Sequence, residues 1–244
     1  MAVAKKLKTI VVLPAYNAEK TLEKTVREIP QEVVEEIILV DDKSHDKTVK
    51  IAQKLNLTVF RHRKNRGYGA NQKTCYLLAL KHHPDIVVML QPDYQYDPKI
   101  IKYFVEFISE DRFDVMLGSR IRSRHEALAG GMPLYKYLGN RFLTIIENFV
   151  SGYNLSEWHT GMRAYKREVL ENIDFLKNSD DFLFDSQILF QIIEKGYRIG
   201  EIPVPVRYFP EASSINFKRS LKYGLGTLAV AAKFLVKKVL PWNT

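Results

Sequence analysis

Two polar segments of the chain carry side-chain types that could bind a metal ion or a nucleotide. The segment MLQPDYQYDP places Asp93 between Gln91 and Gln95, and the segment LVDDKSHDKT contains Asp42 and Ser44. Carboxylate and amide oxygens suit Mg²⁺ or Mn²⁺, which proteins often hold with one or two carboxylates and the phosphates of a substrate. We therefore expect a metal site at Asp93, and at Asp42 an acceptor for the N–H of a nucleobase. A turn and an acidic helix N-terminus are the structural alternatives for these segments.

A glycine-bearing loop, NRGYGANQK, is a candidate for binding a diphosphate. Gly67 and Gly69 precede a predicted helix, where backbone N–H groups can approach phosphate oxygens and the helix dipole favours anions. An ordinary turn would explain the two glycines about as well. Arg66 and Lys73 flank the glycines with positive charge and strengthen the prediction of a phosphate site.

Asp185 is the candidate general base. It follows the apolar residues 182–184 in the segment DDFLFD. Apolar surroundings raise the pKa of a carboxylate, and a general base that works near neutrality needs a raised pKa. A helix cap is the alternative role for this residue. Asp180 and Asp181 fit that role better, because they come earlier, in a polar turn.

These candidates follow apolar runs that are typical of strands buried on both faces. Stretches with helical spacing lie between the runs, and Asn17 is expected to cap the first of them. Strands that alternate with helices predict an α/β fold: a mainly parallel sheet with helices on both faces, where ligands bind at the carboxyl ends of the strands. The expected strands cover residues 9–14, 37–40, 58–61, 86–90 and 115–118.

The second half of the chain is less regular. Its pattern predicts a polar loop, two helices, one extended segment and a pair of short strands. In chain order these are the loop over 120–131, a helix over 135–150, the extended segment over 158–165, a helix over 182–195 and the strands within 197–208.

The composition is that of an ordinary globular protein. Of the 244 residues, 46% are hydrophobic and 27% charged, which excludes a disordered, collagen-like or low-complexity chain. The single cysteine, Cys75, excludes an internal disulfide and a structural zinc site with two cysteines. The N-terminus lacks the apolar core of a signal peptide, and no apolar run reaches the roughly 20 residues of a membrane span. We therefore expect a cytoplasmic protein, peripheral on the membrane at most.

The net charge of +9 predicts a polyanionic partner, which could be a nucleic acid, an anionic lipid surface or a phosphorylated ligand. The sequence has no RNA-recognition signature, no helix-turn-helix pattern and no continuous basic stripe. A basic nucleic-acid-binding module is therefore the weaker interpretation, and we expect no nucleic-acid partner.

The order of the motifs is more specific than any one of them. VVLPAYN, LVDDKS, GYGAN, MLQPDYQ and LGSR follow one another in a way that resembles the family 2 glycosyltransferases. These are inverting enzymes of the GT-A fold that use nucleotide-diphosphate sugars. TGMRAYKREVL resembles the family's acceptor-side motif, and the likeness continues through FLFDSQILFQIIEKGYRIGEIPVPVRY. It covers roughly residues 8–209 and is greatest for the dolichyl- and polyprenyl-phosphate glucosyl and mannosyl synthases.

The resemblance implies a UDP- or GDP-sugar donor, Mg²⁺ or Mn²⁺ as cofactor, and a polyprenyl or dolichyl phosphate as acceptor. A saccharide acceptor is the alternative within the family. A nucleotidyltransferase is disfavoured, because PAYNAEK lacks the glycine- and arginine-rich loop of that class. The resemblance also implies a catalytic domain over 1–214, with a nucleotide-binding half to about 118 and an acceptor half over 119–214.

The site residues implied by the resemblance fall into three groups, and two positions depart from the family pattern. Gln91 stands where the family usually has Asp, which leaves Asp93 as the metal carboxylate with the neutral oxygens of Gln91 and Gln95. Glu157 stands where the family often has Asp. The nucleotide-sugar site would include Pro14, Tyr16, Asn17, Glu19, Asp42, Ser44, Gly69, Lys73 and Gln91; Arg120, His159 and Arg163 would face the acceptor or the sugar phosphate; Asp185 and Asp93 would be catalytic.

Residues 215–244 are predicted to form an amphipathic helix. Leucines such as Leu221, Leu225 and Leu235 recur mostly at steps of three and four, lysines lie among and beside them, and Trp242 follows near the end. The apolar stripe could pack on the domain itself or on a second subunit of a homo-oligomer. It could instead lie in the surface of an anionic membrane, close to a lipid-phosphate acceptor.

Overall fold

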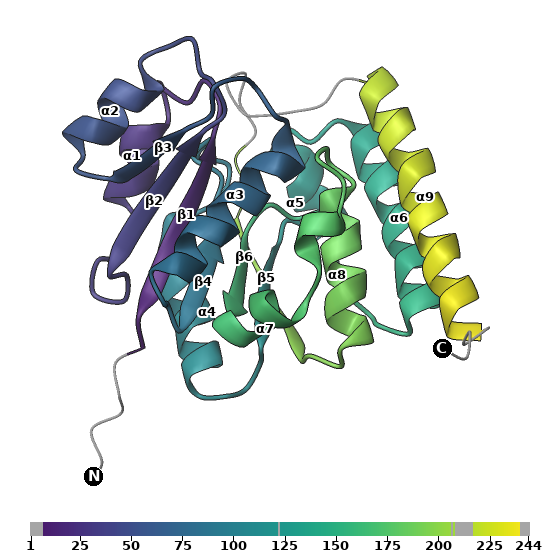
Figure 1. Cartoon of the computed structure of the whole chain (residues 1–244). Helices are drawn as coiled ribbons and strands as arrows, with labels where there is room; N and C mark the ends of the chain where they lie inside the picture. Colours follow the sequence, from purple (N-terminus) through teal and green to yellow (C-terminus); the bar gives the residue numbers. More distant parts are fainter. Residues whose placement is uncertain (1–6, 122, 206, 208–216, 240–244) are drawn as a thin grey trace.

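The structure is a computed structural model that describes residues 7–121, 123–205, 207 and 217–239. A seven-stranded sheet with the order β3-β2-β1-β4-β6-β5-β7 lies at its centre, and helices surround it (Figure 1). The strands are β1 (Thr9–Ala15), β2 (Glu36–Asp41), β3 (Thr58–Arg61), β4 (Ile86–Met89), β5 (Val115–Ser119), β6 (Arg163–Lys166) and β7 (Ile199–Pro203). The helices are α1 (Leu22–Arg27), α2 (Thr48–Lys54), α3 (Tyr68–Lys81), η1 (Pro98–Ile100), α4 (Ile101–Ser109), α5 (Arg124–Ala129), α6 (Leu134–Ser151), α7 (Arg167–Asn172), η2 (Phe175–Lys177), α8 (Phe184–Glu194) and α9 (Phe217–Val239).

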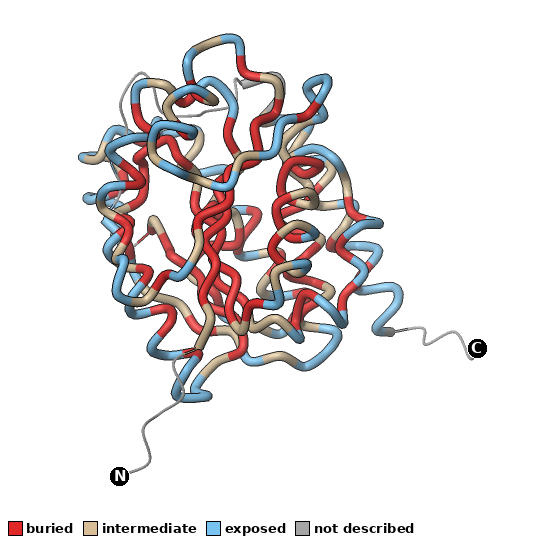
Figure 2. The backbone as a smooth tube through the Cα atoms, turned by 60° about the vertical axis from the view of Figure 1, so that its left-hand side comes forward, coloured by how far each residue is buried: buried red, intermediate tan, exposed pale blue. Residues whose placement is uncertain are grey.

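The central strands are buried on both faces, as their apolar runs predict. Successive residues of β1 point to opposite sides of the sheet. Ile10 and Val12 join a core cluster that includes Tyr76 of α3, whereas Val11 and Leu13 join a second cluster that includes Phe104 of α4. The buried residues, red in Figure 2, run along these strands. The predicted α/β fold with helices on both faces of a mainly parallel sheet is confirmed.

β6 is the exception to the parallel arrangement. The expected extended segment over 158–165 forms a strand only from Arg163, and this strand pairs antiparallel with both β4 and β5. It therefore joins the second half of the chain to the middle of the sheet. Residues 159–161, just before it, are placed at the same edge as the carboxyl ends of β4 and β5, where ligands bind in such sheets.

Three local expectations need correction. Asn17 does not cap the first helix: it has a left-handed backbone with φ 52°, and the helix begins only after Thr21. The polar loop over 120–131 contains α5, whose N-cap Ser123 accepts a hydrogen bond from the Glu126 N–H. Of the two strands expected within 197–208, the structure has β7, and residues 206 and 208 lie outside the described part.

The C-terminal helix α9 lies along α6 and also contacts α8 (Figure 1). Phe234 packs on Phe190 of α8 with ring centroids 4.6 Å apart, so one side of α9 docks on the domain. Trp242 lies outside the described residues. Within the described ranges, none of the helices has both the length and the hydrophobicity needed to cross a membrane.

Candidate active site

Two clefts open at the carboxyl edge of the sheet. The first cleft lies among the loops that follow β1, β2 and β4, the start of α3 and the segment 179–182. The second cleft lies between the loop after β5, the turn 159–161 and the N-terminal parts of α6 and α9. Tyr68, Gln91 and Phe182 line both clefts, so the two meet at these side chains.

The loops after β1 and β2 are joined by three of the predicted nucleotide-site residues. Asn17 donates its N–H to Ser44 Oγ at 2.8 Å and accepts from the His45 N–H at 2.9 Å. The Glu19 carboxylate accepts from the Lys47 N–H at 2.9 Å. Pro14, Tyr16 and Asn17 line the first cleft, but Glu19 does not. Glu19 therefore supports the cleft wall, and its contact with the nucleotide stays a prediction.

Asp42 lines the first cleft and organises the loop that precedes α3. Its carboxylate accepts hydrogen bonds from the N–H groups of Arg66 and Gly67 at 2.8 and 2.9 Å, and His62 Nδ1 lies 2.7 Å from it. Only 3% of the residue is exposed. The carboxylate therefore holds the loop in place, and the predicted contact with a nucleobase stays a prediction.

The two glycines of the loop serve different steric needs. Gly67 has φ +98°, a conformation that favours glycine, and it precedes the first turn of α3. A Cβ at Gly69 would lie 2.4 Å from the carbonyl oxygen of Ser179, so only glycine lets the segment 179–181 cross α3 here. The N–H of Gly69 donates to the Asp180 carbonyl at 2.8 Å. The predicted position of Gly69 beside a diphosphate is corrected, because this N–H points to protein.

Lys73 also turns away from the clefts. Its ammonium donates to the carbonyl of Asn178 and to the Asp180 carboxylate, the latter at 2.8 Å. It lines neither cleft, so its expected contact with the nucleotide sugar is corrected to a tie between α3 and the segment 178–180. Arg66 is exposed and lines the first cleft, so this loop does present a positive charge to a ligand there.

Asp93 and Gln95 lie in different clefts. Asp93 follows β4 and lines the first cleft, where one of its oxygens accepts from the Gln95 N–H at 3.0 Å. Gln95 lines the second cleft, and its predicted role as a metal ligand together with Asp93 stays a prediction. Among the described residues, no group of three or more His, Cys, Asp or Glu side chains is arranged to hold a metal. One carboxylate does fit an ion that takes most of its ligands from substrate phosphates and water.

A chain of hydrogen bonds crosses the junction of the clefts. The Gln91 amide donates to the Tyr68 hydroxyl at 3.0 Å, and this hydroxyl donates to Asp185 Oδ2 at 2.9 Å. Burial and the adjacent Asp185 raise the pKa of Tyr68 well above its usual value, so the phenol keeps its proton. The second oxygen of Asp185 lies 3.3 Å from the Gln72 amide and 3.5 Å from Arg163. The apolar surroundings expected for Asp185 are therefore wrong.

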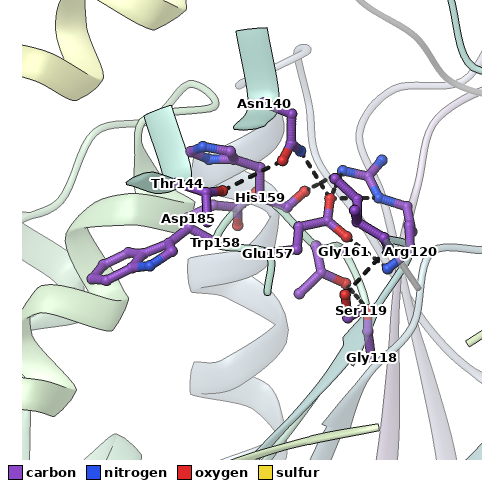
Figure 3. A network of polar contacts seen from close by, with 12 residues as sticks. Gly118, Ser119, Arg120, Asn140, Thr144, Glu157, Trp158, His159, Gly161 and Asp185 are labelled. Atoms are coloured by element: carbon purple, nitrogen blue, oxygen red, sulfur yellow. Dashed lines mark hydrogen bonds and ion pairs between the residues drawn. The ribbon is translucent and has the colours of Figure 1, made fainter. Parts of the chain in front are cut away.

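Arg120 enters the second cleft from the end of β5, held by a buried carboxylate (Figure 3). Its Nε donates to Glu157 at 2.8 Å and its backbone N–H donates to the same carboxylate at 2.7 Å, while Asn140 of α6 donates at 3.0 Å. Burial alone would raise the pKa of Glu157, but the charge and hydrogen bonds of Arg120 outweigh burial and lower it. Glu157 thus fixes the direction of Arg120.

Arg163 does not face a substrate. It is fully buried, and its guanidinium donates to the carbonyls of Trp158, Thr160 and Asp185 at 2.9 to 3.1 Å. The expectation that it contacts the acceptor or sugar phosphate is corrected: it holds the turn that precedes β6. At Gly161 in this turn, a Cβ would lie 2.7 Å from the Gln91 amide nitrogen, so glycine is required for Gln91 to occupy the junction.

His159 lines the second cleft and also joins its two helices. Its Nδ1 lies 2.5 Å from the Tyr223 hydroxyl of α9, and its Nε2 lies 3.1 Å from the fully buried Glu147 of α6. Both ring nitrogens are directed at protein groups. The predicted substrate contact of His159 stays a prediction, and its contacts show that it holds α6 and α9 at the cleft.

Sequence reasoning missed several residues of the junction and the second cleft. Tyr68 stacks on Phe182 with ring centroids 4.7 Å apart, and both lie where the clefts meet. The tyrosine inside GYGAN was the available signal. Lys136 and Tyr223 stand on helices far from any motif, so no local pattern pointed to them.

Comparisons with known proteins identify the family of the chain. The model of the family "Glycosyl transferase family 2" matches residues 10–174. The chain is 30% identical over 201 residues to a dolichyl-phosphate hexose transferase of Haloferax volcanii, with 81% of this chain and 82% of that protein covered. It is 28% identical over 214 residues to a UDP-N-acetylglucosamine–dolichyl-phosphate N-acetylglucosaminyltransferase of Methanococcus voltae, with 81% and 84% covered.

Solved structures share the fold. Glucosyl-3-phosphoglycerate synthase from Mycobacterium tuberculosis, in complex with Mn²⁺, UDP-glucose and phosphoglyceric acid, superposes with a TM-score of 0.72 at 18% identity, over 94% of this chain and 80% of that one. At this identity the likeness shows a common fold alone. Because the family model matches more than half of the chain and the Haloferax relative supports it, the chain belongs to glycosyl transferase family 2 and is a glycosyltransferase.

Proposed function

We propose that this enzyme transfers a sugar from a UDP- or GDP-sugar to a polyprenyl or dolichyl phosphate. The nucleoside diphosphate occupies the first cleft and the acceptor phosphate occupies the second. The observation that carries the proposal is the composition of the second cleft, which combines cations with apolar walls and meets the first cleft at Gln91.

The cations of the second cleft suit a phosphate group. Arg120 and Lys136 both line it, and burial together with the charge of Arg120 lowers the pKa of Lys136. An anion between the two side chains would relieve their repulsion, and the guanidinium fork matches phosphate oxygens. Met132, Leu143 and Tyr135 supply apolar wall beside these cations, which suits the hydrocarbon chain of a lipid phosphate better than a saccharide.

The first cleft suits a nucleoside diphosphate with a divalent ion. Asp93 is the carboxylate that would hold Mg²⁺ or Mn²⁺, and Arg66, which also lines this cleft, adds positive charge. The ion would neutralise charge on the departing diphosphate. The Mycobacterium neighbour was solved with Mn²⁺ and UDP-glucose, which supports a divalent ion and a uridine donor as the first to be tested.

The reaction follows from the junction of the clefts. An acceptor phosphate oxygen forms a bond to the anomeric carbon, while the bond from that carbon to the diphosphate oxygen breaks and the nucleoside diphosphate leaves with the electron pair. Attack from the second cleft, opposite the leaving group in the first, inverts the anomeric configuration. A lipid phosphate is already ionised, so Asp185 acts through Tyr68 to position Gln91 beside the sugar.

A saccharide acceptor is the second candidate, favoured by one observation. Asp185 lines the second cleft, where it could take the proton of an attacking hydroxyl. Asp185→Asn separates the candidates. With a phosphate acceptor the variant should keep measurable turnover with an unchanged pH profile. With a hydroxyl acceptor it should lose the base and nearly all activity.

The proposal is tested by a donor and acceptor screen. Purified enzyme is incubated with UDP-glucose, UDP-N-acetylglucosamine or GDP-mannose, with and without Mn²⁺, and with either dolichyl phosphate in detergent or a panel of saccharides. We expect release of nucleoside diphosphate and labelled lipid only with the lipid phosphate and the metal. Transfer to a saccharide with none to the lipid would refute the proposed acceptor.

A matched pair of variants tests the second cleft. Lys136→Gln should raise the KM for dolichyl phosphate by about tenfold, since a charge-assisted hydrogen bond contributes about 1.5 kcal/mol or more. Lys99→Gln, an exposed lysine outside both clefts, is the control and should behave as wild type. Equal KM values for the two variants would place the acceptor phosphate elsewhere.

A further inference from the structure

Helix α6 exposes an apolar stripe along its whole length. Its members are spaced by four, four, three and four residues, which places them on one face of a helix. Each is more than half exposed, and Phe149 is 85% exposed. Side chains of this size are normally buried in a folded protein. The stripe consists of Leu134, Leu138, Phe142, Ile145 and Phe149.

Helix α9, which lies along α6, also exposes apolar side chains. Leu221, Leu225 and Val236 are 58%, 62% and 53% exposed although the opposite side of α9 packs on α8. The two helices run parallel and side by side (Figure 1). Near their C-terminal ends the Lys238 ammonium reaches the Ser151 carbonyl at 3.5 Å. The helix pair thus carries exposed apolar side chains from both members, and we call it the α6–α9 face.

The charges of the α6–α9 face have one sign. The sequence of α9 contains no Asp or Glu, and the single acidic residue of α6, Glu147, is fully buried against His159. Lys222 and Lys233 of α9 are exposed. In a symmetric dimer the same patch meets itself, so a second copy on this face would add only positive charge to the interface. An anionic surface complements both the apolar rows and the positive charge.

We propose that the α6–α9 face docks on a lipid bilayer that contains anionic headgroups, with the two helices lying in the plane of the interface. Amphipathic helices with lysines beside an apolar face bind in this way, and they do so without spanning the bilayer. Among the described helices none is suited to cross a membrane, which agrees with docking in the interface. The inference goes beyond the transfer reaction, because docking requires neither donor nor metal.

The docked orientation also sets the position of the second cleft. Lys136 and Gly139 of α6 and Tyr223 of α9 line this cleft from the N-terminal parts of the same helices. A bilayer on the α6–α9 face therefore lies next to the cleft mouth. A lipid-borne ligand could then reach the cleft while its hydrocarbon chain remains partly in the membrane.

Vesicle co-sedimentation without nucleotide sugar tests the proposal. The full chain is mixed with vesicles of phosphatidylcholine alone or with one third phosphatidylglycerol at low salt. We expect binding to the anionic vesicles that weakens as salt rises. Phe142→Gln with Phe149→Gln should lower the partition coefficient by at least about thirtyfold, since two large apolar side chains no longer enter the interface. The control pair Leu77→Gln with Leu176→Gln removes exposed leucines from other faces and should bind like wild type.

The charges are tested by a second matched pair. Lys222→Gln with Lys233→Gln should weaken binding to anionic vesicles by about thirtyfold and leave binding to neutral vesicles unchanged. Lys50→Gln with Lys54→Gln, two exposed lysines of α2, is the control. All substituted positions are exposed, so unchanged unfolding temperatures are expected.

Three outcomes would overturn the inference. These are a wild-type chain that stays in the supernatant with anionic vesicles at low salt, an apolar variant that binds as well as its control, and a dimer in light scattering that Phe142→Gln with Phe149→Gln converts to monomer. The last outcome would assign the face to a second copy. Activity on dolichyl phosphate in detergent is measured separately, so loss of the transfer reaction and loss of docking are distinguishable.

Discussion

The Tyr68 hydroxyl lies 2.9 Å from Asp185 Oδ2 and accepts the Gln91 amide at 3.0 Å, so one phenol joins the walls of both clefts. The three residues come from the start of α3, the start of α8 and the segment that follows β4. The arrangement couples the position of Gln91, next to the proposed sugar site, to a carboxylate that lies 117 residues from Tyr68 in the sequence.

Tyr68→Phe should lower kcat while the fold remains intact. The substitution removes one hydroxyl that serves both Gln91 and Asp185, and a hydrogen bond to a charged group contributes about 1.5–3 kcal/mol, or about 10- to 100-fold in rate. Steady-state kinetics with saturating donor would measure the loss. Tyr103→Phe, a substitution at an exposed tyrosine of α4, is the matched control. A kcat equal to that of the control would show that the bridge is structural only.

Asp93→Ala should abolish turnover without unfolding the protein. Asp93 is the proposed metal carboxylate at the end of β4, and the charge that a metal ion stabilises is worth several kcal/mol, so a loss of at least about a hundredfold is expected. The measurement is kcat under saturating Mg²⁺ or Mn²⁺, with unfolding temperature as a check of the fold. Asp97→Ala removes a cap from η1 and serves as the control. Near-wild-type turnover of Asp93→Ala would contradict the assignment of Asp93 as the metal-binding carboxylate.

Asp42→Ala should weaken nucleotide binding more than it slows the chemical step. The carboxylate holds the Arg66 and Gly67 N–H groups, so its loss loosens the wall of the first cleft. Binding lost equally from ground and transition states raises KM and leaves kcat less affected. Calorimetric titration with UDP or GDP should show a Kd about tenfold higher, equivalent to about 1.4 kcal/mol. Asp42→Asn keeps one acceptor oxygen, so its Kd should lie between those of wild type and Asp42→Ala. An unchanged Kd for Asp42→Ala contradicts the prediction.

Glu157→Gln should cost stability at neutral pH and little in acid. The pKa of Glu157 is lowered in the folded protein, so its stabilising effect is present above its unfolded pKa of about 4.3 and is lost as the pH falls through the folded value. At pH 7 the variant leaves Arg120 beside a neutral group, which we expect to lower the free energy of unfolding by about 3 kcal/mol.

The pH dependence is checked by urea unfolding of both proteins between pH 7 and pH 3. The difference in the free energy of unfolding between wild type and Glu157→Gln should become smaller as the pH is lowered toward 3. Glu110→Gln changes an exposed carboxylate of a surface ion pair and should give a small difference at every pH. If the difference in the free energy of unfolding between wild type and Glu157→Gln stays constant with pH, the carboxylate charge of Glu157 does not stabilise the fold.

Several features could be predicted because they depend on residues close together in the chain. Apolar runs such as residues 9–14 need only their own side chains to indicate a buried strand, and the five strands predicted in the first half are all present. The parallel arrangement then places the ends of β1, β2 and β4 at one edge. For this reason Pro14, Tyr16, Asp42 and Asp93 line one cleft.

Other features depended on contacts that no local pattern encodes. Arg163 faces the core and not a ligand because its guanidinium donates to three backbone carbonyl groups that the fold brings around it. The surroundings of Asp185 were decided by α3, which brings Tyr68 and Gln72 to a carboxylate whose chain neighbours are apolar. The amino-acid sequence by itself determined the elements and the edge at which the site lies, because strand and helix periodicity is a local property. Only the tertiary structure decided which of the polar side chains at that edge face a cleft and which form hydrogen bonds with other protein groups. The physical reason is that a buried charge must be paired with whatever partners folding brings to it.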